Sequence, residues 1–64
     1  MASLETNRRR VIAQLEREGW YLKRHGKEHD VYGHPNLKGR IIVPRHNTLS
    51  PGVARKIAKE AGWS

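Results

Sequence analysis

The sequence predicts a small two-layer α+β domain in which two amphipathic helices cover one face of a three-stranded antiparallel sheet. Two helix-periodic segments flank a central region of short strand-like runs that Gly and Pro separate. Short connections between consecutive strands favour an antiparallel meander. Helices whose apolar stripes need burial then pack on one sheet face. We therefore expect the order α-β-β-β-α within a single domain of residues 1–64.

The first helix is expected over residues 4–18. Its apolar stripe at helical spacing is formed by Leu4, Val11, Ile12 and Leu15. Ser3 is a candidate N-cap, because its hydroxyl can accept a hydrogen bond from a free backbone amide of the first turn. Gly19 suits the left-handed position that follows many helices.

Three short strands are expected between the helices, at residues 20–25, 29–33 and 40–43. Strand alternation places Trp20, Leu22 and Arg24 on one side of the first strand, and this side should face the core. The same alternation separates His29 from Asp30, so these two neighbours should point to opposite faces and not form a dyad.

The second helix should begin at Ser50 and Pro51, with Ser as N-cap and Pro at the first helical position. Gly62 should end it, and Trp63 should fold back on its last turn. The predicted apolar stripe consists of Val53, Ala54, Ile57, Ala58 and Ala61.

Composition narrows the functional classes. The chain has 64 residues, a formal net charge of +7 and no cysteine, which excludes disulfides and Cys-based zinc sites. It has no apolar run long enough to cross a bilayer and no secretory signal, so we expect a soluble cytoplasmic protein without a membrane partner. The positive charge favours nucleic acid or an acidic protein as partner, but it does not by itself indicate an enzyme.

His29 is the candidate for chemistry. It follows the polar turn Gly26-Lys27-Glu28 at the start of the second strand. An imidazole with an ordinary pKa of about 6.5 suits the proton transfers of RNA cleavage, in which the 2′-hydroxyl attacks the adjacent phosphorus. Lys and Arg suit the stabilisation of phosphoryl charge. The alternative is that His29 is an ordinary exposed turn residue.

The other histidines are weaker candidates. His25 is a possible second proton shuttle but is better placed on a solvated strand face, and His34 should be a surface loop residue. His46 is expected to be structural or neutral. The spacing of His25, His29 and His34 fits neither a helical His pair nor a zinc finger, so no metal and no other cofactor is expected.

Basic residues form three groups. Arg8, Arg9 and Arg10 fan out around the first helix, where a solvated face explains them at least as well as RNA contact. The other two groups are candidate RNA-binding residues that converge on a phosphate backbone if they lie together. They are Lys23, Arg24 and Lys27 near the hairpin, and Arg55, Lys56 and Lys59 on the second helix.

Several motifs occur in an order that resembles the HicA toxin family of HicA–HicB toxin–antitoxin modules. The resemblance runs from Val11 to Ser64. No single motif is diagnostic, but the order and spacing are fairly specific. The motifs are Leu15-Glu16-Arg17-Glu18-Gly19-Trp20, Gly26-Lys27-Glu28-His29, His34-Pro35, Val43-Pro44-Arg45-His46, Pro51-Gly52 and the run from Ile57 to Ser64.

The resemblance implies a fold like a double-stranded RNA-binding domain and a ribonuclease that cleaves mRNA without a metal, with His29 at the catalytic position. It also implies a HicB-type antitoxin that covers this site, and operator DNA as a partner only through that antitoxin. Glu28 departs from the family, whose members often have Ser there. Three consequences stay open: weaker RNA binding, an altered acidity of the neighbouring imidazole, or a carboxylate that points away.

Two rival functions remain open at this point. One is a non-catalytic RNA-binding module of the same fold. The other is a small basic protein whose main role is to bind an acidic protein. Turnover of RNA separates the ribonuclease from both rivals, and salt-sensitive RNA binding separates the two rivals from each other.

Overall fold

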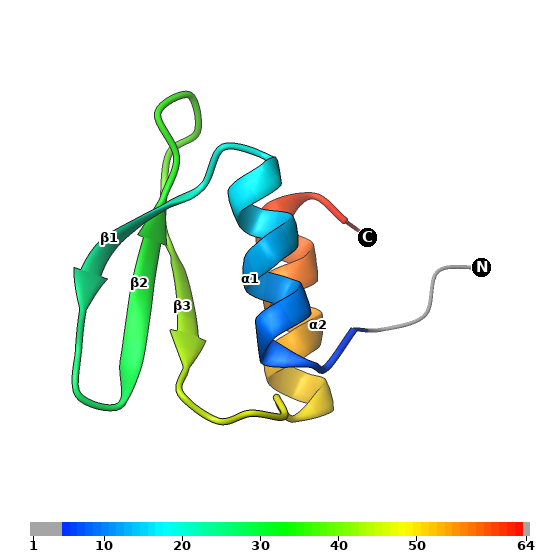
Figure 1. Cartoon of the computed structure of the whole chain (residues 1–64). Coiled ribbons are helices and arrows are strands. Elements are labelled where there is room, and N and C mark those ends of the chain that lie inside the picture. Colours follow the sequence, from blue (N-terminus) through cyan, green and yellow to red (C-terminus); the bar gives the residue numbers. More distant parts are fainter. Residues whose placement is uncertain (1–4, 64) are drawn as a thin grey trace.

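The computed structural model describes residues 5–63 and has the expected element order. The elements are α1 (Arg8–Arg17), β1 (Tyr21–His25), β2 (His29–Gly33), β3 (Ile41–Pro44) and α2 (Pro51–Ala61). The strands form one antiparallel sheet in the order β1-β2-β3, and both helices lie on the same side of it (Figure 1). The α-β-β-β-α prediction is confirmed.

Helix α1 begins later than the sequence predicts. Its N-cap is Asn7, whose side chain accepts a hydrogen bond from the Arg10 amide at 3.2 Å. Residues just before the helix pair instead with the β3–α2 connection, because the Leu49 amide donates to the Thr6 carbonyl at 2.7 Å. Residues 5–7 precede the helix, so the predicted start at residue 4 is wrong. The candidate cap Ser3 and the apolar Leu4 lie outside the described residues.

The register of β1 corrects the predicted strand faces. Leu22 pairs with Tyr32, but Arg24 pairs with Val31, because a β-bulge lies between Leu22 and Arg24. One extra residue reverses the alternation of side chains. Arg24 thus lies on the open face of the sheet with Val31, not on the core side, and Leu22 is 48% exposed on its edge strand.

The core lies between the sheet and the two helices. Among the described residues the apolar stripes of both helices are confirmed, with Val11 and Leu15 buried on α1 and Ala54, Ile57 and Ala58 buried on α2. The remaining core side chains come from the sheet and its connections: Trp20, Tyr32, Ile41, Val43 and Leu49.

The end of α1 and both ends of α2 agree with the sequence. The Ser50 hydroxyl accepts a hydrogen bond from the Val53 amide at 3.3 Å, and Gly19 and Gly62 adopt positive φ angles of 98° and 82°. Trp63 packs against the core, and its indole nitrogen donates to the Glu18 carboxylate at 2.7 Å. Neither described helix is long and apolar enough to cross a membrane.

Candidate functional site: a basic groove on the open sheet face

His29 lies on the sheet face that the helices leave uncovered. Its neighbours Asp30 and Tyr32 are buried on the helix side, whereas His29 itself is exposed at the start of β2. The imidazole borders a shallow groove, called here the His29 groove. The residues that line it are Lys23, Arg24, His29, Val31, Arg40 and Ile42.

The β1–β2 turn fixes where His29 begins the strand. The Gly26 amide donates to the His29 carbonyl at 3.0 Å, and the Arg45 amide donates to the Glu28 carbonyl at 3.0 Å. A Cβ atom on Gly26 would lie 2.5 Å from the His29 carbonyl oxygen, so only glycine allows this close approach. The backbone at the root of His29 is thus held from both sides.

The β-bulge brings two of the predicted cations to the groove. Lys23 and Arg24 both line it, although they are consecutive residues that strict alternation would separate. Lys27 lines an adjoining pocket together with Arg24 and His29. The predicted hairpin group of basic residues therefore does gather around His29.

Sequence reasoning missed Arg40 as a groove residue. Arg40 lies two positions before Ile42, and both line the groove. Because side chains alternate along a strand, residues two apart share a face, and this spacing predicts Arg40 on the same face as Ile42.

The basic residues of α2 lie elsewhere. Arg55, Lys56 and Lys59 are exposed on α2. Both helices lie on one side of the sheet (Figure 1), whereas the His29 groove is lined by residues of the other sheet face. They do not line the groove, so the two candidate RNA-binding groups occupy different layers of the domain.

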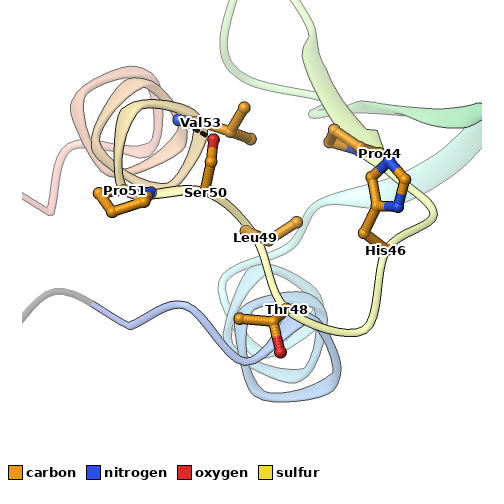
Figure 2. Close-up of a pocket in the computed structure, with 7 residues that line it drawn as sticks. All are labelled: Pro44, His46, Thr48, Leu49, Ser50, Pro51 and Val53. Atoms are coloured by element: carbon orange, nitrogen blue, oxygen red, sulfur yellow. Dashed lines mark hydrogen bonds between the residues drawn. The ribbon is translucent and has the colours of Figure 1, made fainter.

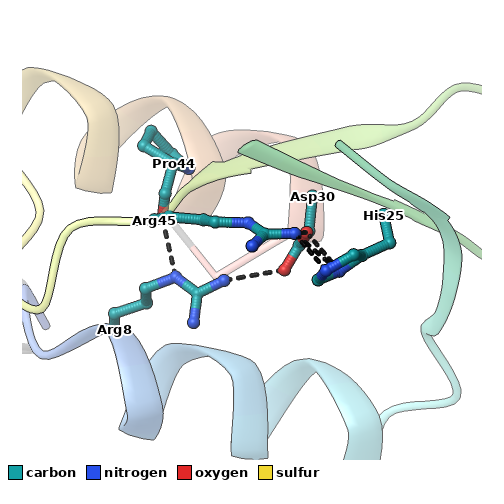
Figure 3. Close-up of polar contacts among 5 residues, drawn as sticks. All are labelled: Arg8, His25, Asp30, Pro44 and Arg45. Carbon is teal, nitrogen blue, oxygen red and sulfur yellow. Dashed lines mark hydrogen bonds and ion pairs between the residues drawn. The ribbon is translucent and has the colours of Figure 1, made fainter. Parts of the chain in front are cut away.

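Asp30 is the centre of a cluster of charges on the helix side of the sheet (Figure 3). Its side chain is 9% exposed and accepts hydrogen bonds from Arg8 at 2.8 Å and from Arg45 at 2.9 Å. Arg8 also donates from Nε to the Pro44 carbonyl at 2.7 Å, so this side chain links α1, β2 and β3. We call Arg8, His25, Asp30 and Arg45 the Asp30 cluster.

The arginines keep Asp30 ionised. Burial raises the pKa of Asp30, but the hydrogen bond and charge of Arg45 and the charges of His25 and Arg8 outweigh it, so the pKa lies below the ordinary 3.8. The cluster places a buried anion on one face of β2 while His29 points from the other. The expectation that Asp30 and His29 do not form a dyad is confirmed.

His25 belongs to the Asp30 cluster rather than to a free strand face. Its Nδ1 lies 3.1 Å from the Asp30 carboxylate and 2.7 Å from the Arg45 guanidinium. A ring protonated at Nδ1 donates to Asp30, whereas a ring with a free Nδ1 accepts from Arg45. The side chain is 66% exposed, but the β-bulge turns it toward the helix side, away from the His29 groove.

His34 has a structural role. Its Nε2 lies 2.8 Å from the Glu18 carbonyl at the end of α1, and its Nδ1 accepts from the Asn36 amide at 3.1 Å. These partners assign the proton to Nε2, because a carbonyl oxygen can only accept. The ring also packs edge-on against Trp20, with centroids 5.2 Å apart. His34 thus links the β2–β3 loop to α1.

A second groove lies between the end of β3 and the start of α2. Figure 2 shows its lining residues on both sides of Leu49: Pro44 and His46 on one side, and Ser50, Pro51 and Val53 on the other, with Thr48 below. This groove is larger than the His29 groove, but none of the predicted RNA-binding residues lines it. The polar atom of Ser50 is already engaged as the cap of α2.

The described part of the chain, residues 5–63, contains no group of three or more His, Asp or Glu side chains arranged to hold a metal ion. The charges of the His29 groove are all positive: Lys23, Arg24 and Arg40 surround the imidazole. Such an arrangement attracts anions, and phosphates in particular.

A comparison with protein families gives the same assignment as the motifs. The family described as HicA toxin of bacterial toxin–antitoxin matches residues 8–63, which include every helix and strand of the domain. No curated protein matches the chain. The chain therefore belongs to the HicA toxin family and is the toxin component of a toxin–antitoxin pair.

Proposed function

We propose that this toxin is a metal-independent endoribonuclease that cleaves mRNA, with His29 as its acid–base group. The observation that carries the proposal is the position of the exposed imidazole, which borders a groove with cationic side chains on several sides. Membership of the HicA family supplies the toxin role and an antitoxin partner. The cationic groove beside His29 supports the catalytic part of the proposal.

The reaction needs no nucleophile from the protein. The 2′-oxygen of a ribose forms a bond to the adjacent phosphorus, and the bond from phosphorus to the 5′-oxygen breaks. The proton of the 2′-hydroxyl goes to a base, and the leaving 5′-oxygen receives a proton. His29 performs one of these transfers, and water that enters the open groove performs the other.

The cations of the groove hold the phosphate and stabilise the charge that develops on it. Lys23, Arg24 and Arg40 line the groove around His29, and Lys27 lies beside it. Fixed positive charges aimed at a developing anion are a large contribution in many enzymes. In this proposal the charged side chains themselves stabilise the phosphate, so the reaction needs no metal ion.

Glu28 does not line this groove. The residue is exposed, and only its carbonyl is used locally, as acceptor for the Arg45 amide. It lines neither of the two pockets that contain His29. This supports the alternative in which the carboxylate that replaces the more usual Ser points away from the phosphate.

The antitoxin in this proposal is a HicB-like protein that covers the His29 groove. An inhibitor of this groove must offer negative charge to Lys23, Arg24 and Arg40, since opposite charges steer and fix such interfaces. Operator DNA is bound by the antitoxin, and the toxin reaches DNA only through it.

The test is cleavage of a defined RNA oligonucleotide by purified protein in EDTA. A second oligonucleotide lacks the 2′-hydroxyl only at the linkage that is cut. We expect cleavage of the first with a 2′,3′-cyclic phosphate end, and an intact linkage in the second. Products with 3′-hydroxyl and 5′-phosphate ends, or a requirement for added metal, would contradict the mechanism.

A second function is favoured by the separate basic surface of α2. Arg55, Lys56 and Lys59 are exposed in the helix layer and do not depend on His29 to bind phosphates. A non-catalytic RNA-binding module would use this surface. This alternative function predicts an RNA affinity that falls steeply with salt concentration, and no RNA cleavage in any buffer.

A further inference from the structure

We propose that the His29 groove contains a subsite for one unpaired nucleobase of single-stranded RNA, with the side chains of Val31 and Ile42 as its apolar floor. The inference rests on the proposed function, because it concerns the substrate of the same groove. It adds which form of RNA the groove takes and which residues hold the base.

The floor follows from the strand register. Val31 pairs directly with Ile42 on β3, and Arg24 pairs with Val31 from β1. The three side chains therefore form one row across the open face of the sheet, with the cation at one end. Directly paired residues on one face lie about 4.5–5.5 Å apart at Cβ, so the two apolar side chains form one continuous surface.

This apolar surface is open to solvent. Ile42 is 41% exposed, and Val31 is partly exposed beside it. A single exposed apolar residue is ordinary on a protein surface. Here the exposed pair lies inside a groove whose rim carries Lys23, Arg24 and Arg40, so the site offers apolar contact and positive charge within one ligand-sized space.

The size of the groove fits a small ligand unit. Its volume is about 390 Å³. Pockets that take small molecules have volumes of roughly 300–1,000 Å³. The groove therefore has room for a nucleotide.

Of the two forms of RNA, only the unpaired strand complements this combination. A duplex presents phosphates and 2′-hydroxyls at its surface and keeps the faces of its bases stacked inside. It satisfies the cations of the groove but gives the apolar floor no partner. A single strand presents both phosphates and base faces, which is the usual basis of single-strand recognition on a protein surface.

The subsite also explains how the cleaved linkage is placed. Val31 lies two residues after His29 on the same face of β2, which corresponds to about 6–7 Å along the strand. A base held on Val31 and Ile42 therefore keeps its own ribose and phosphate near the imidazole. In this arrangement the floor positions the substrate, and His29 moves the proton.

The test measures binding without cleavage. The probe is a fluorescent single-stranded RNA with 2′-O-methyl groups, which cannot form the attacking hydroxyl, and the same strand annealed to its complement. Affinities are measured by anisotropy for wild type, Ile42→Ser and Leu37→Ser. Leu37 is the matched control, because it is 50% exposed in the β2–β3 loop and does not line the groove.

We expect Ile42→Ser to weaken single-strand binding by roughly fivefold to tenfold, at the low end of effects for base-stacking residues. Duplex binding should change less than about twofold, because phosphate contacts remain. Leu37→Ser should change neither affinity. Equal losses for single strand and duplex, or no loss with Ile42→Ser, would overturn the subsite and leave the apolar floor as a surface for a protein partner.

An abasic scan makes the test independent of folding defects. An abasic nucleotide is placed at each position of the probe in turn. One position should weaken binding to wild type by at least the factor of Ile42→Ser, and should have a clearly smaller effect on that variant, in which only Val31 remains of the floor. Additive losses at every position would contradict the proposal. Because the probe cannot be cut, the result does not depend on whether the protein is a ribonuclease.

Discussion

Replacing Asp30 with Asn tests the ion pairs at the centre of the Asp30 cluster. Asn keeps the volume of the side chain but removes the charge that Arg8 and Arg45 share. Asp30 is buried, with only 9% of its side chain exposed, so the two cations lose a partner in a poorly solvated place. The variant Asp30→Asn should therefore be less stable than wild type.

The expected loss follows from burial. Removing one partner of a fully buried ion pair costs about 3–5 kcal/mol. The side chains of Arg8 and Arg45 are 23% and 33% exposed, so water recovers part of their solvation. We therefore expect about 2–3 kcal/mol, an intermediate value between buried and surface pairs. For a domain of this length the total stability is of the order of 3–10 kcal/mol, so the loss is large.

The assay is urea unfolding followed by the fluorescence of Trp20 and Trp63, one buried in the core and one packed against it. Glu60→Gln is the control, because Glu60 is exposed on α2 and its change should stay within about 0.5 kcal/mol. A loss below about 0.5 kcal/mol for Asp30→Asn at neutral pH would show that the charge of the Asp30 cluster does not support the fold.

The pH dependence has a definite sign. The folded-state pKa of Asp30 is lower than its ordinary value of 3.8, so the carboxylate contributes stability above that pH. This contribution is lost as the pH falls below 3.8 and through the folded-state pKa. The difference in stability between wild type and Asp30→Asn should thus be constant near neutral pH and shrink in acid. A difference that is unchanged at pH 2–3 would refute the reasoning.

Four further variants each change a single residue. Gly19→Ala should destabilise the domain by about 1–2 kcal/mol, because Gly19 has a positive φ and an added Cβ would lie 2.8 Å from the His34 ring. Gly52→Ala should stabilise it by about 0.5–1 kcal/mol, because Gly52 lies in α2 with open space around it. Urea unfolding measures both changes. Ser50→Ala should cost about 1 kcal/mol in the same assay, and no loss would refute its capping role. Arg24→Gln should lower the slope of log RNA affinity against log salt by about 0.7; an unchanged slope would remove Arg24 from the phosphate contacts.

The sequence predicts the elements of this fold well because their signals are local. Ser50 and Pro51 mark the start of α2, and Gly62 marks its end, since caps depend on the residue at one position. The buried stripes on both helices follow from spacing alone. The start of α1 was misplaced because Asn7 and the pairing of residues 6–8 with the β3–α2 connection compete with helix, and that pairing is not local.

The candidate site was predicted only in part. The grouping of His29 with Lys23, Arg24 and Lys27 follows from their order along the chain. Arg24 was placed on the wrong face because a β-bulge has no clear sequence signal in this strand, and the same shift hid the contact between His25 and Asp30. Arg8 was assigned to a fanned group of arginines, although it reaches Asp30 across the domain. Such contacts depend on how the helices and the sheet pack together. The spacing of residues along the chain does not predict this packing.

The central claim is that His29 moves a proton in RNA cleavage, and the most direct measurement compares three rates. Cleavage of saturating RNA in EDTA is followed for wild type, His29→Ala and His46→Ala. His46 is the matched control, because it is exposed and lines the other groove. We expect His29→Ala to be slower by about 100- to 10,000-fold, the usual contribution of a positioned acid–base group, with His46→Ala near wild type. Equal rates for wild type and His29→Ala would contradict the account.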